Sequence, residues 1–262
     1  MRNFRILVFA VWVTTPRVVH RVGWGSLALL ILKALWLDRI PELLSGSYEL
    51  GVIVQNVLSS MVAAYIFFVI SYQLPLVLER IPVAPTIAML MDQVVHQVTA
   101  TLHEINFAAH SKDGSASLPS TVTEAFIMDL FSKTDPNSDS SRYNTRTMAR
   151  ASWLGSMMDH SARSVKYIDH LWRYSRLFES EMPALLEAIR FSGHIRSLDD
   201  LRDLIGESGR ANSDMSAWAS AYYRHYQLGL RLQEYGARYR ARYAVTGSFS
   251  SGYFEGAKLE CA

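Results

Sequence analysis

Two Asp-His pairs are the part of this sequence that most directly points to chemistry, because carboxylate and imidazole groups together bind divalent metals and move protons. The pairs are Asp159-His160 and Asp169-His170, ten residues apart in a segment that we expect to be helical. Ten residues turn a helix by ~1000°, which leaves the pairs ~80° out of line. A metal-dependent hydrolase is therefore the weakest of the functions considered. We assign no catalytic, metal-binding or cofactor-binding residue, and we expect no cofactor.

Three histidines recur at a regular interval on another predicted helix. His96, His103 and His110 are each seven residues apart, so they share one helix face. Neighbouring members lie ~10.5 Å apart along the axis, too far to share one metal ion with bonds of ~2 Å. The simplest interpretation is a polar face at the edge of a bundle. A pH-responsive stripe and a metal site shared between two chains remain as alternatives.

The last predicted helix mixes tyrosines with arginines, a combination that can stack bases, bind phosphates or pack against a core. The tyrosines are Tyr222, Tyr223, Tyr226, Tyr235, Tyr239 and Tyr243, and the arginines are Arg224, Arg231, Arg238, Arg240 and Arg242. We interpret the helix as structural, with Arg224, Arg231, Arg238 and Arg242 as a candidate surface for lipid or a protein partner. A nucleic-acid partner is not expected, because the net charge is only +2.

The bulk composition narrows the class of protein. Of the 262 residues, 19% are charged, which is less than the quarter or so typical of soluble domains. The single cysteine, Cys261, excludes an internal disulfide and is compatible with a reducing compartment. Signature motifs of P-loop, zincin or serine-hydrolase sites are absent from the sequence.

Two apolar segments predict membrane spans. Residues 51–78 carry no charge and exceed the ~20 residues that a bilayer requires. Residues 22–37 form a shorter candidate, in which Lys33 lies close enough to the end to reach the interface. Trp24 and Trp36 sit near its two ends, where interfacial tryptophans are common. Residues 6–13 are too short to cross, so we expect an interfacial segment, with a cleaved signal peptide as the alternative.

Charge asymmetry predicts the topology. Four arginines and no acid precede the first span, whereas acids dominate the connection at residues 38–50. The positive-inside rule then puts the N-terminus in the cytoplasm. Two crossings return the chain there, which makes this a multi-pass protein of a bacterial inner membrane with a cytoplasmic C-terminal domain.

Small and polar residues interrupt the second span at helical spacing. They are Gln55, Asn56, Ser59, Ser60, Ala63 and Ala64. Such a stripe favours contact with protein over contact with lipid. It either packs against the first span, or forms a helix-association seam or the lining of a pore.

The rest of the chain predicts an all-α fold: two transmembrane helices followed by an antiparallel helical bundle. We expect a membrane domain at 1–80, the bundle at 81–244 and a disordered tail at 245–262. Pro75 should bend or end the second span, and Pro82 and Pro85 should mark a stiff exit from it. Apolar periodicity predicts helices at about 86–109, 124–131, 147–178, 181–192 and 214–243, and a short one that ends near 206. Residues 135–144 should form a loop, Gly193 a C-cap, and Ser197 with Asp200 the start of the short helix.

These features favour a membrane-anchored helical interaction or sensor protein without catalytic activity, with self-association as part of the hypothesis. An oligomeric pore gated by the bundle is the alternative, ahead of the hydrolase. The expected partners are the lipid bilayer and either a second copy of the chain or a protein that binds the bundle.

Overall fold

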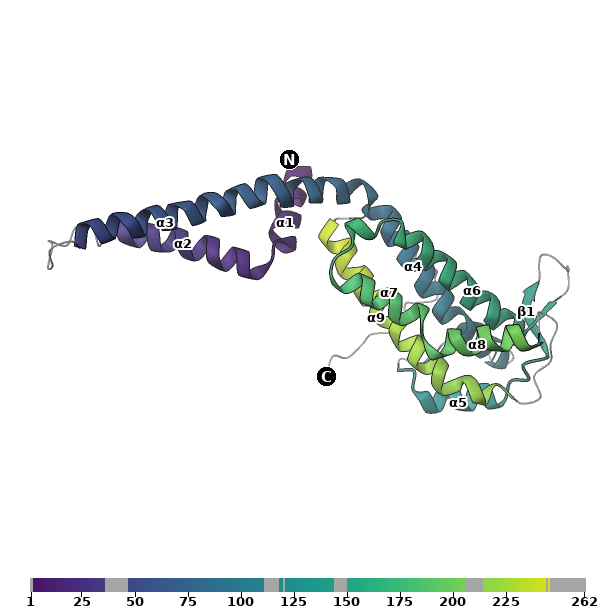
Figure 1. The fold of residues 1–262 in the computed structure, drawn as a ribbon. Coiled ribbons are helices and arrows are strands. Elements are labelled where there is room, and N and C mark those ends of the chain that lie inside the picture. The colour runs from purple at the N-terminus through teal and green to yellow at the C-terminus, as the bar shows by residue number, and fades with distance from the viewer. Residues whose placement is uncertain are drawn as a thin grey trace. The chain divides into compact units, whose positions relative to one another are not determined.

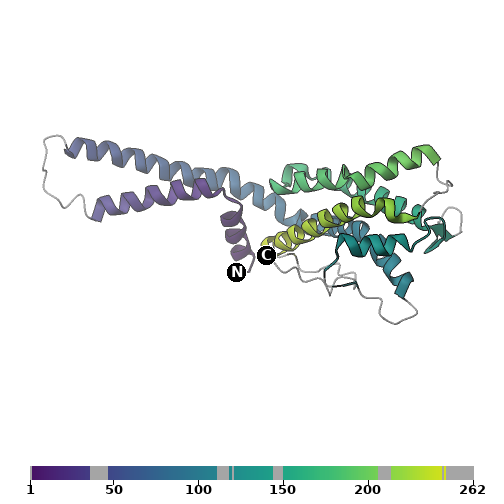
Figure 2. The ribbon, with the colours of Figure 1, turned by 90° about the horizontal axis from the view of Figure 1, so that it is seen from below.

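The computed structural model describes residues 2–35, 47–110, 118–119, 121–143, 150–205, 214–243 and 245, and these residues are almost entirely helical (Figures 1 and 2). The chain divides into two compact units between Ala84 and Pro85, with residues 242–244 assigned to the N-terminal unit. The all-α prediction is confirmed for the described residues, apart from one small hairpin. The expected tail lies outside them, except for Val245.

The N-terminal unit contains α1 (Arg2–Thr14), α2 (Arg17–Leu35) and α3 (Ser47–Phe68). Pro16 separates α1 from α2, because a proline breaks a helix interior but suits the residues around a helix start. α2 and α3 lie side by side as an antiparallel pair (Figures 1 and 2). Two helical runs, Arg17–Leu35 and Gly51–His110, are long and apolar enough to cross a membrane.

Pro75 does not end the second long helix. A five-residue π-helix, η2 (Val69–Gln73), joins α3 directly to α4 (Leu74–His110). The Leu74 N–H reaches back five residues to the Val69 carbonyl, a wide turn that accommodates a proline ring and its missing N–H. Pro82 and Pro85 lie inside α4, so the expected helix start at 86 is wrong.

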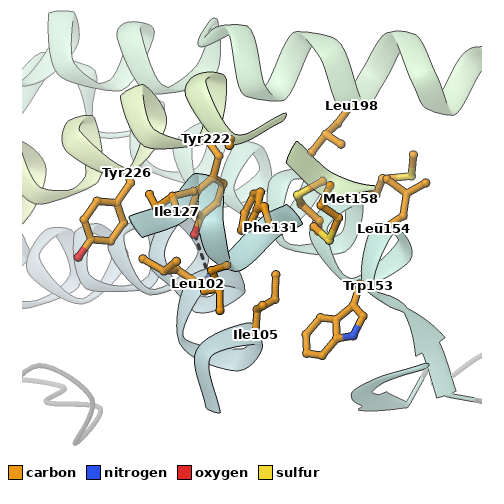
Figure 3. Close-up of a cluster of buried hydrophobic side chains, with 14 residues drawn as sticks. Leu102, Ile105, Ile127, Phe131, Trp153, Leu154, Met158, Leu198, Tyr222 and Tyr226 are labelled. Atoms are coloured by element: carbon orange, nitrogen blue, oxygen red, sulfur yellow. Dashed lines mark hydrogen bonds between the residues drawn. The ribbon is translucent and has the colours of Figure 1, made fainter. Parts of the chain in front are cut away.

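The C-terminal unit packs further helices around the rest of α4. They are α5 (Glu124–Ser132), α6 (Trp153–Trp172), α7 (Glu181–Arg190), α8 (Gly193–Ile205) and α9 (Ala219–Tyr243), with the short helices η3 (Ser175–Leu177) and η4 (Met215–Trp218). One apolar cluster joins α4 to α5, α6, α8, η4 and α9. Leu102, Phe131, Leu154, Leu198 and Tyr222 are each at most 3% exposed there (Figure 3).

A short antiparallel hairpin corrects the expected loop and long helix. β1 (Asp139–Tyr143) pairs with β2 (Arg150–Ser152), with Asp139 opposite Ser152 and Tyr143 opposite Arg150. α6 therefore begins at Trp153, not near 147, and it ends at Trp172. Ser152 sets its start, because its extended backbone leaves the hydroxyl free to accept the Gly155 N–H at 3.1 Å.

The turn between α7 and α8 was also predicted wrongly. Gly193 is the first residue of α8 and not the C-cap of the preceding helix. The hydroxyl of Ser192 accepts the Ile195 N–H at 3.4 Å, so Ser192 caps α8. Ser197 lies within the helix, where its hydroxyl donates to the His194 carbonyl. The helix start predicted at Ser197 is therefore five residues too late.

Candidate functional site

α2 and α3 meet along one face of each helix, at three levels. A Cβ added at Gly23 would lie 2.5 Å from the Tyr65 ring, so the glycine lets the ring lie directly on the α2 backbone. Further along, the Ser26 hydroxyl approaches the Met61 sulfur at 3.7 Å. Near the end of α2, Lys33 Nζ donates to Gln55 Oε1 at 2.9 Å.

His20 ties α1 to this pair. Its Nε2 lies 2.9 Å from the Trp12 carbonyl oxygen, and its Nδ1 lies 2.9 Å from the Tyr65 hydroxyl. A carbonyl only accepts, so Nε2 carries the hydrogen and Nδ1 accepts from Tyr65 in the neutral ring. The ring also lies against the Trp12 indole, with centroids 4.3 Å apart. One histidine of α2 therefore contacts both α1 and α3.

The structure splits the six-residue stripe of the second span. All six members are exposed, and only Gln55 among them has a hydrogen bond to α2 in the part of the chain that the structure describes. The other five are Asn56, Ser59, Ser60, Ala63 and Ala64. At ~100° per residue, Tyr65 lies ~180° around α3 from Asn56. Ser60 donates its hydroxyl to the backbone carbonyl of Asn56. The side-chain amide of Asn56 is not used in this bond and lies at the surface. The polar face and the face that contacts α2 are thus on opposite sides of α3.

A polar network is buried between α4 and α6 in the C-terminal unit. His160, 2% exposed, places Nδ1 2.9 Å from Gln97 Oε1 and Nε2 3.3 Å from Glu104 Oε1. Ser156 donates to the other oxygen of Glu104 at 3.2 Å. The spacings explain the geometry, because Gln97 and Glu104 are two turns apart on α4, and Ser156 and His160 are one turn apart on α6. The network joins the two helices through polar side chains.

This network separates the members of the first Asp-His pair. His160 is buried, but Asp159 is exposed on the other side of α6. Asp169 forms an ion pair with Arg190, and His170 is half-buried. Within the described ranges, no three His, Cys, Asp or Glu side chains lie close enough together to hold a metal ion.

The three heptad-spaced histidines are each half-buried on α4. Burial, with a smaller contribution from the charge of His96, lowers the pKa of His103 to about 4. His110 donates a ring N–H to the Asn106 carbonyl one turn earlier at 3.0 Å. His103 therefore stays neutral at physiological pH.

A second group of buried polar side chains lies between α8 and α9. Ser192 Oγ is 2.9 Å from His225 Nδ1. The His194 ring lies 5.0 Å from the His225 ring, and its edge faces Tyr222. Burial lowers the pKa of His225 to about 4 and holds that of His194 well below its usual 6.5. Both rings are thus kept neutral inside the bundle.

Tyr222 interacts with the backbone of α4. Its hydroxyl donates to the Val98 carbonyl at 2.9 Å. It also accepts the Leu102 N–H at 3.1 Å (Figure 3). These two backbone groups are hydrogen-bond partners in a regular helix, so the hydroxyl contacts both members of one turn of α4. Burial raises the pKa of Tyr222 far above its usual range, and the side chain remains a neutral phenol.

Tyr222→Phe is expected to lower the free energy of unfolding by about 1–3 kcal/mol, because it removes a buried hydroxyl that donates to the Val98 carbonyl and accepts the Leu102 N–H. Chemical denaturation of the detergent-solubilised chain, followed by circular dichroism, measures the change. Tyr223→Phe is the matched control, since it removes the same atom from the adjacent, partly exposed residue. Equal effects of the two substitutions would contradict a stabilising contact between the Tyr222 hydroxyl and α4.

The arginines and tyrosines of α9 occupy different faces. Five of the six tyrosines are buried, and Tyr223 is half-buried. Arg224, Arg231 and Arg238 are exposed, and Arg242 is half-buried. Arg238 donates to both carboxylate oxygens of Glu181 at 3.1 Å. Arg240, which the predicted surface omitted, instead pairs with Asp92 on α4.

Sequence reasoning missed several of these residues. Tyr222, Gln97 and Ser192 stand in ordinary amphipathic patterns, and nothing nearby in the sequence marks their partners. One signal was present, because Gly229 and Gly236 recur at heptad spacing among the tyrosines of α9. Small residues on an otherwise aromatic face indicate a close helix contact. Comparison of the chain with protein-family models, curated proteins and solved structures gives no match.

Proposed function

We propose that this chain is a membrane-anchored helical interaction protein that self-associates through α3. In this proposal α2 and α3 cross a bacterial inner membrane, and the N-terminus and the C-terminal unit lie in the cytoplasm. The large apolar side chains exposed on α2 and α3 support the placement in lipid. Among them are Leu29, Ile31, Ile53 and Phe67, at 50–70% exposed.

The observation that carries the self-association is the exposed polar face of α3. Asn56, Ser59 and Ser60 would face hydrocarbon in a lone hairpin, where an amide group has no partner. Ala63 continues the same face and would let another helix approach closely. α2 cannot cover this face, because it packs on the opposite side of α3 through Tyr65. A second copy supplies an identical face with matching amide and hydroxyl groups.

The same face favours a packed seam over a pore. An aqueous pore needs polar lining along the whole depth of the membrane. Here the face becomes apolar after Ala64, and Phe67, 70% exposed, lies on the same side as Asn56 at ~100° per residue. We therefore place helix packing ahead of conduction.

Disulfide cross-linking in native membranes tests the seam. In a Cys261→Ser background, Asn56→Cys and Ala63→Cys are expected to give cross-linked dimers on mild oxidation. Val57→Cys and Ile66→Cys are the controls, because both residues are exposed but lie ~80–100° around the helix from Asn56. Cross-linking of all four positions to the same extent, or of none, would overturn the proposal.

A complementary experiment measures the mass of the detergent-solubilised chain by light scattering. Asn56→Leu with Ser60→Leu should shift a defined oligomer toward the monomer, because the seam loses its polar contacts. Val57→Leu is the control for added bulk on a neighbouring exposed face. An unchanged oligomer in the double variant would count against α3 as the contact.

The exposed arginines of α9 remain a predicted surface for lipid headgroups or for a protein partner. Arg224 and Arg231 are the strongest candidates, because both are exposed, whereas Arg238 forms an ion pair with Glu181. A row of guanidinium groups two turns apart matches an anionic partner.

A further inference from the structure

The exposed face of α1 is apolar, although its 13 residues, at ~1.5 Å rise each, are too few to cross a bilayer. Every exposed side chain in the described part of α1 is hydrophobic. These side chains are Val8, Phe9, Trp12 and Val13, each 38–54% exposed. Ala10, by contrast, is fully buried. An apolar surface of this kind marks contact with a membrane or with another protein.

Two tryptophans extend this apolar face onto α2. The ring centroid of Trp12 lies 6.0 Å from that of Trp24, and both side chains are about half exposed. At ~100° per residue, Trp24 lies ~20° around α2 from Arg17 and ~60° from Arg21. Both arginines are exposed. Ser26, which faces α3, lies ~180° around α2 from Arg17, so the basic face of α2 points away from α3.

Apolar and basic side chains thus form one surface on two consecutive helices. We refer to Val8, Phe9, Trp12, Arg17, Arg21 and Trp24 as the α1–α2 surface. α1 crosses the end of the α2–α3 pair and does not continue along it (Figures 1 and 2). When α2 and α3 cross a bilayer, the start of α2 at Arg17 lies near the headgroups. The α1–α2 surface then lies at the depth where interfacial tryptophans are common.

The charge of this region identifies the partner. Residues 1–37 contain five Lys or Arg residues and no Asp or Glu. Cations beside tryptophans and an apolar face are complementary to anionic headgroups above hydrocarbon. A second copy of the chain would bring Arg17 and Arg21 against the same arginines, and like charges facing each other across an interface are unfavourable. Charge complementarity therefore favours an anionic lipid surface over self-association at this place.

We propose that the α1–α2 surface binds the anionic phospholipids of one leaflet. Arg17 and Arg21 donate to the lipid phosphate groups, and Phe9 and the two tryptophans enter the adjoining hydrocarbon. The inference rests on the proposed function, because it requires α2 and α3 to cross the bilayer. It adds the class of lipid and the residues that recognise it.

Native mass spectrometry of the full-length chain, released from detergent in the presence of defined lipids, tests the recognition of charge. The probes are phosphatidylglycerol and, as the zwitterionic comparison, phosphatidylcholine. The test variant is Arg17→Gln with Arg21→Gln. Its matched control is Arg163→Gln with Lys166→Gln, which removes two exposed cations from α6 in the C-terminal unit.

The wild-type chain and the α6 control are expected to retain phosphatidylglycerol more than phosphatidylcholine, by about fivefold for each of the two arginines. The Arg17 and Arg21 double variant should lose this preference. Equal retention of the two lipids by the wild-type chain would overturn the proposal. The same preference in the wild-type chain and the double variant would overturn it too.

A fluorescent label tests the position of α1 in the membrane. In a Cys261→Ser background, Phe9→Cys is labelled with a polarity-sensitive dye, and the chain is reconstituted into vesicles of phosphatidylglycerol and phosphatidylcholine. Lipids that carry a nitroxide close to the headgroup are expected to quench this label. Ala162→Cys, exposed on α6, is the control and should not be quenched. An unquenched label at Phe9, or disulfide cross-links between copies through Phe9→Cys, would overturn the proposal.

An alkaline carbonate wash of the vesicles separates this inference from the proposed function. Release of the chain would refute the placement of α2 and α3 across the bilayer, and this inference with it. A chain that resists the wash but carries an unquenched label at Phe9 would refute the α1–α2 surface alone. Loss of the Asn56→Cys cross-links with Phe9 still quenched would refute the α3 seam alone.

Discussion

The C-terminal unit is expected to lose stability as the pH falls from about 6.5 to about 4, because its interior holds neutral histidines. Burial lowers the pKa of His225 from 6.5 to about 4, and it also lowers the pKa values of His103 and His194. Between pH 6.5 and 4 these histidines are protonated in the unfolded chain but remain largely neutral in the folded chain. The free energy of unfolding therefore falls as acid is added, and the full stability is present above pH 6.5.

The expected loss of the free energy of unfolding is large for a single titrating group. At about 1.4 kcal/mol per pKa unit, His225 alone contributes about 3 kcal/mol of stability that is lost by pH 4. Asp92 acts in the opposite direction. Burial raises its pKa despite the neighbouring Arg240, so its protonation favours the folded state in acid. Since three histidines oppose one carboxyl group, the net effect remains destabilising.

Denaturant unfolding of the solubilised chain at a series of pH values measures this dependence. His225→Asn should reduce the slope by up to ~1.4 kcal/mol per pH unit between pH 6.5 and 4, because one proton no longer distinguishes the two states. Ser192→Ala is the control, since it removes the hydroxyl partner of His225 and keeps a titrating imidazole. An identical slope in wild type and His225→Asn would contradict the attribution of this pH dependence to His225.

Gly229→Ala is expected to destabilise the C-terminal unit by about 1–3 kcal/mol. A Cβ at this position would lie 2.6 Å from Val98 Cγ1 and 3.2 Å from Val98 Cβ. Valine is stiff at χ1 and cannot rotate away cheaply. α4 also cannot move away from α9 freely, because Tyr222, on α9 like Gly229, donates a hydrogen bond to the Val98 carbonyl of α4. The overlap outweighs the gain of up to ~1 kcal/mol that alanine brings to a helix interior.

Gly236→Ala supplies the matched comparison seven residues along α9. The nearest atom to an added Cβ there is 3.8 Å away, on the flexible Arg240 side chain. This substitution should be neutral, or stabilising by up to ~1 kcal/mol. Thermal or denaturant unfolding separates the two variants. Val98→Ala should rescue Gly229→Ala in a double-mutant cycle, and absence of coupling would argue against the close contact.

Local patterns in the sequence were enough to determine the fold class and most helices. The uncharged run at 51–78 and the apolar periodicity of the later segments depend on the residues of one helix alone, so they are readable without knowing any partner. The Tyr-rich stretch at 214–243 was correctly identified as a helix, with its first turn in the short η4. Hydrogen bonds within a helix and the removal of apolar side chains from water follow directly from such patterns.

Errors arose where two local signals compete. Ser192 and Ser197 both offer a capping hydroxyl, and Ser192 is the cap because it also bonds to His225 on α9. The hairpin at 139–152 lacks the usual turn dipeptide, and its second strand leads directly into α6. Pro75 was expected to bend or end the helix, but η2 widens the turn and the helix continues into α4.

Only the tertiary structure decided which polar residues share a site. Gln55 and Asn56 are adjacent in sequence, yet one contacts Lys33 on α2 and the other lies on the opposite side of α3. Asp159 and His160 are adjacent too, and the bundle buries only the histidine, against Gln97 and Glu104. One residue turns a helix by ~100°, so neighbours in sequence face different partners. The sequence by itself therefore determined the helices and their apolar faces, whereas the hydrogen bond between Lys33 and Gln55, the contact of the Tyr222 hydroxyl with α4 and the neutral histidines depend on which helices come together.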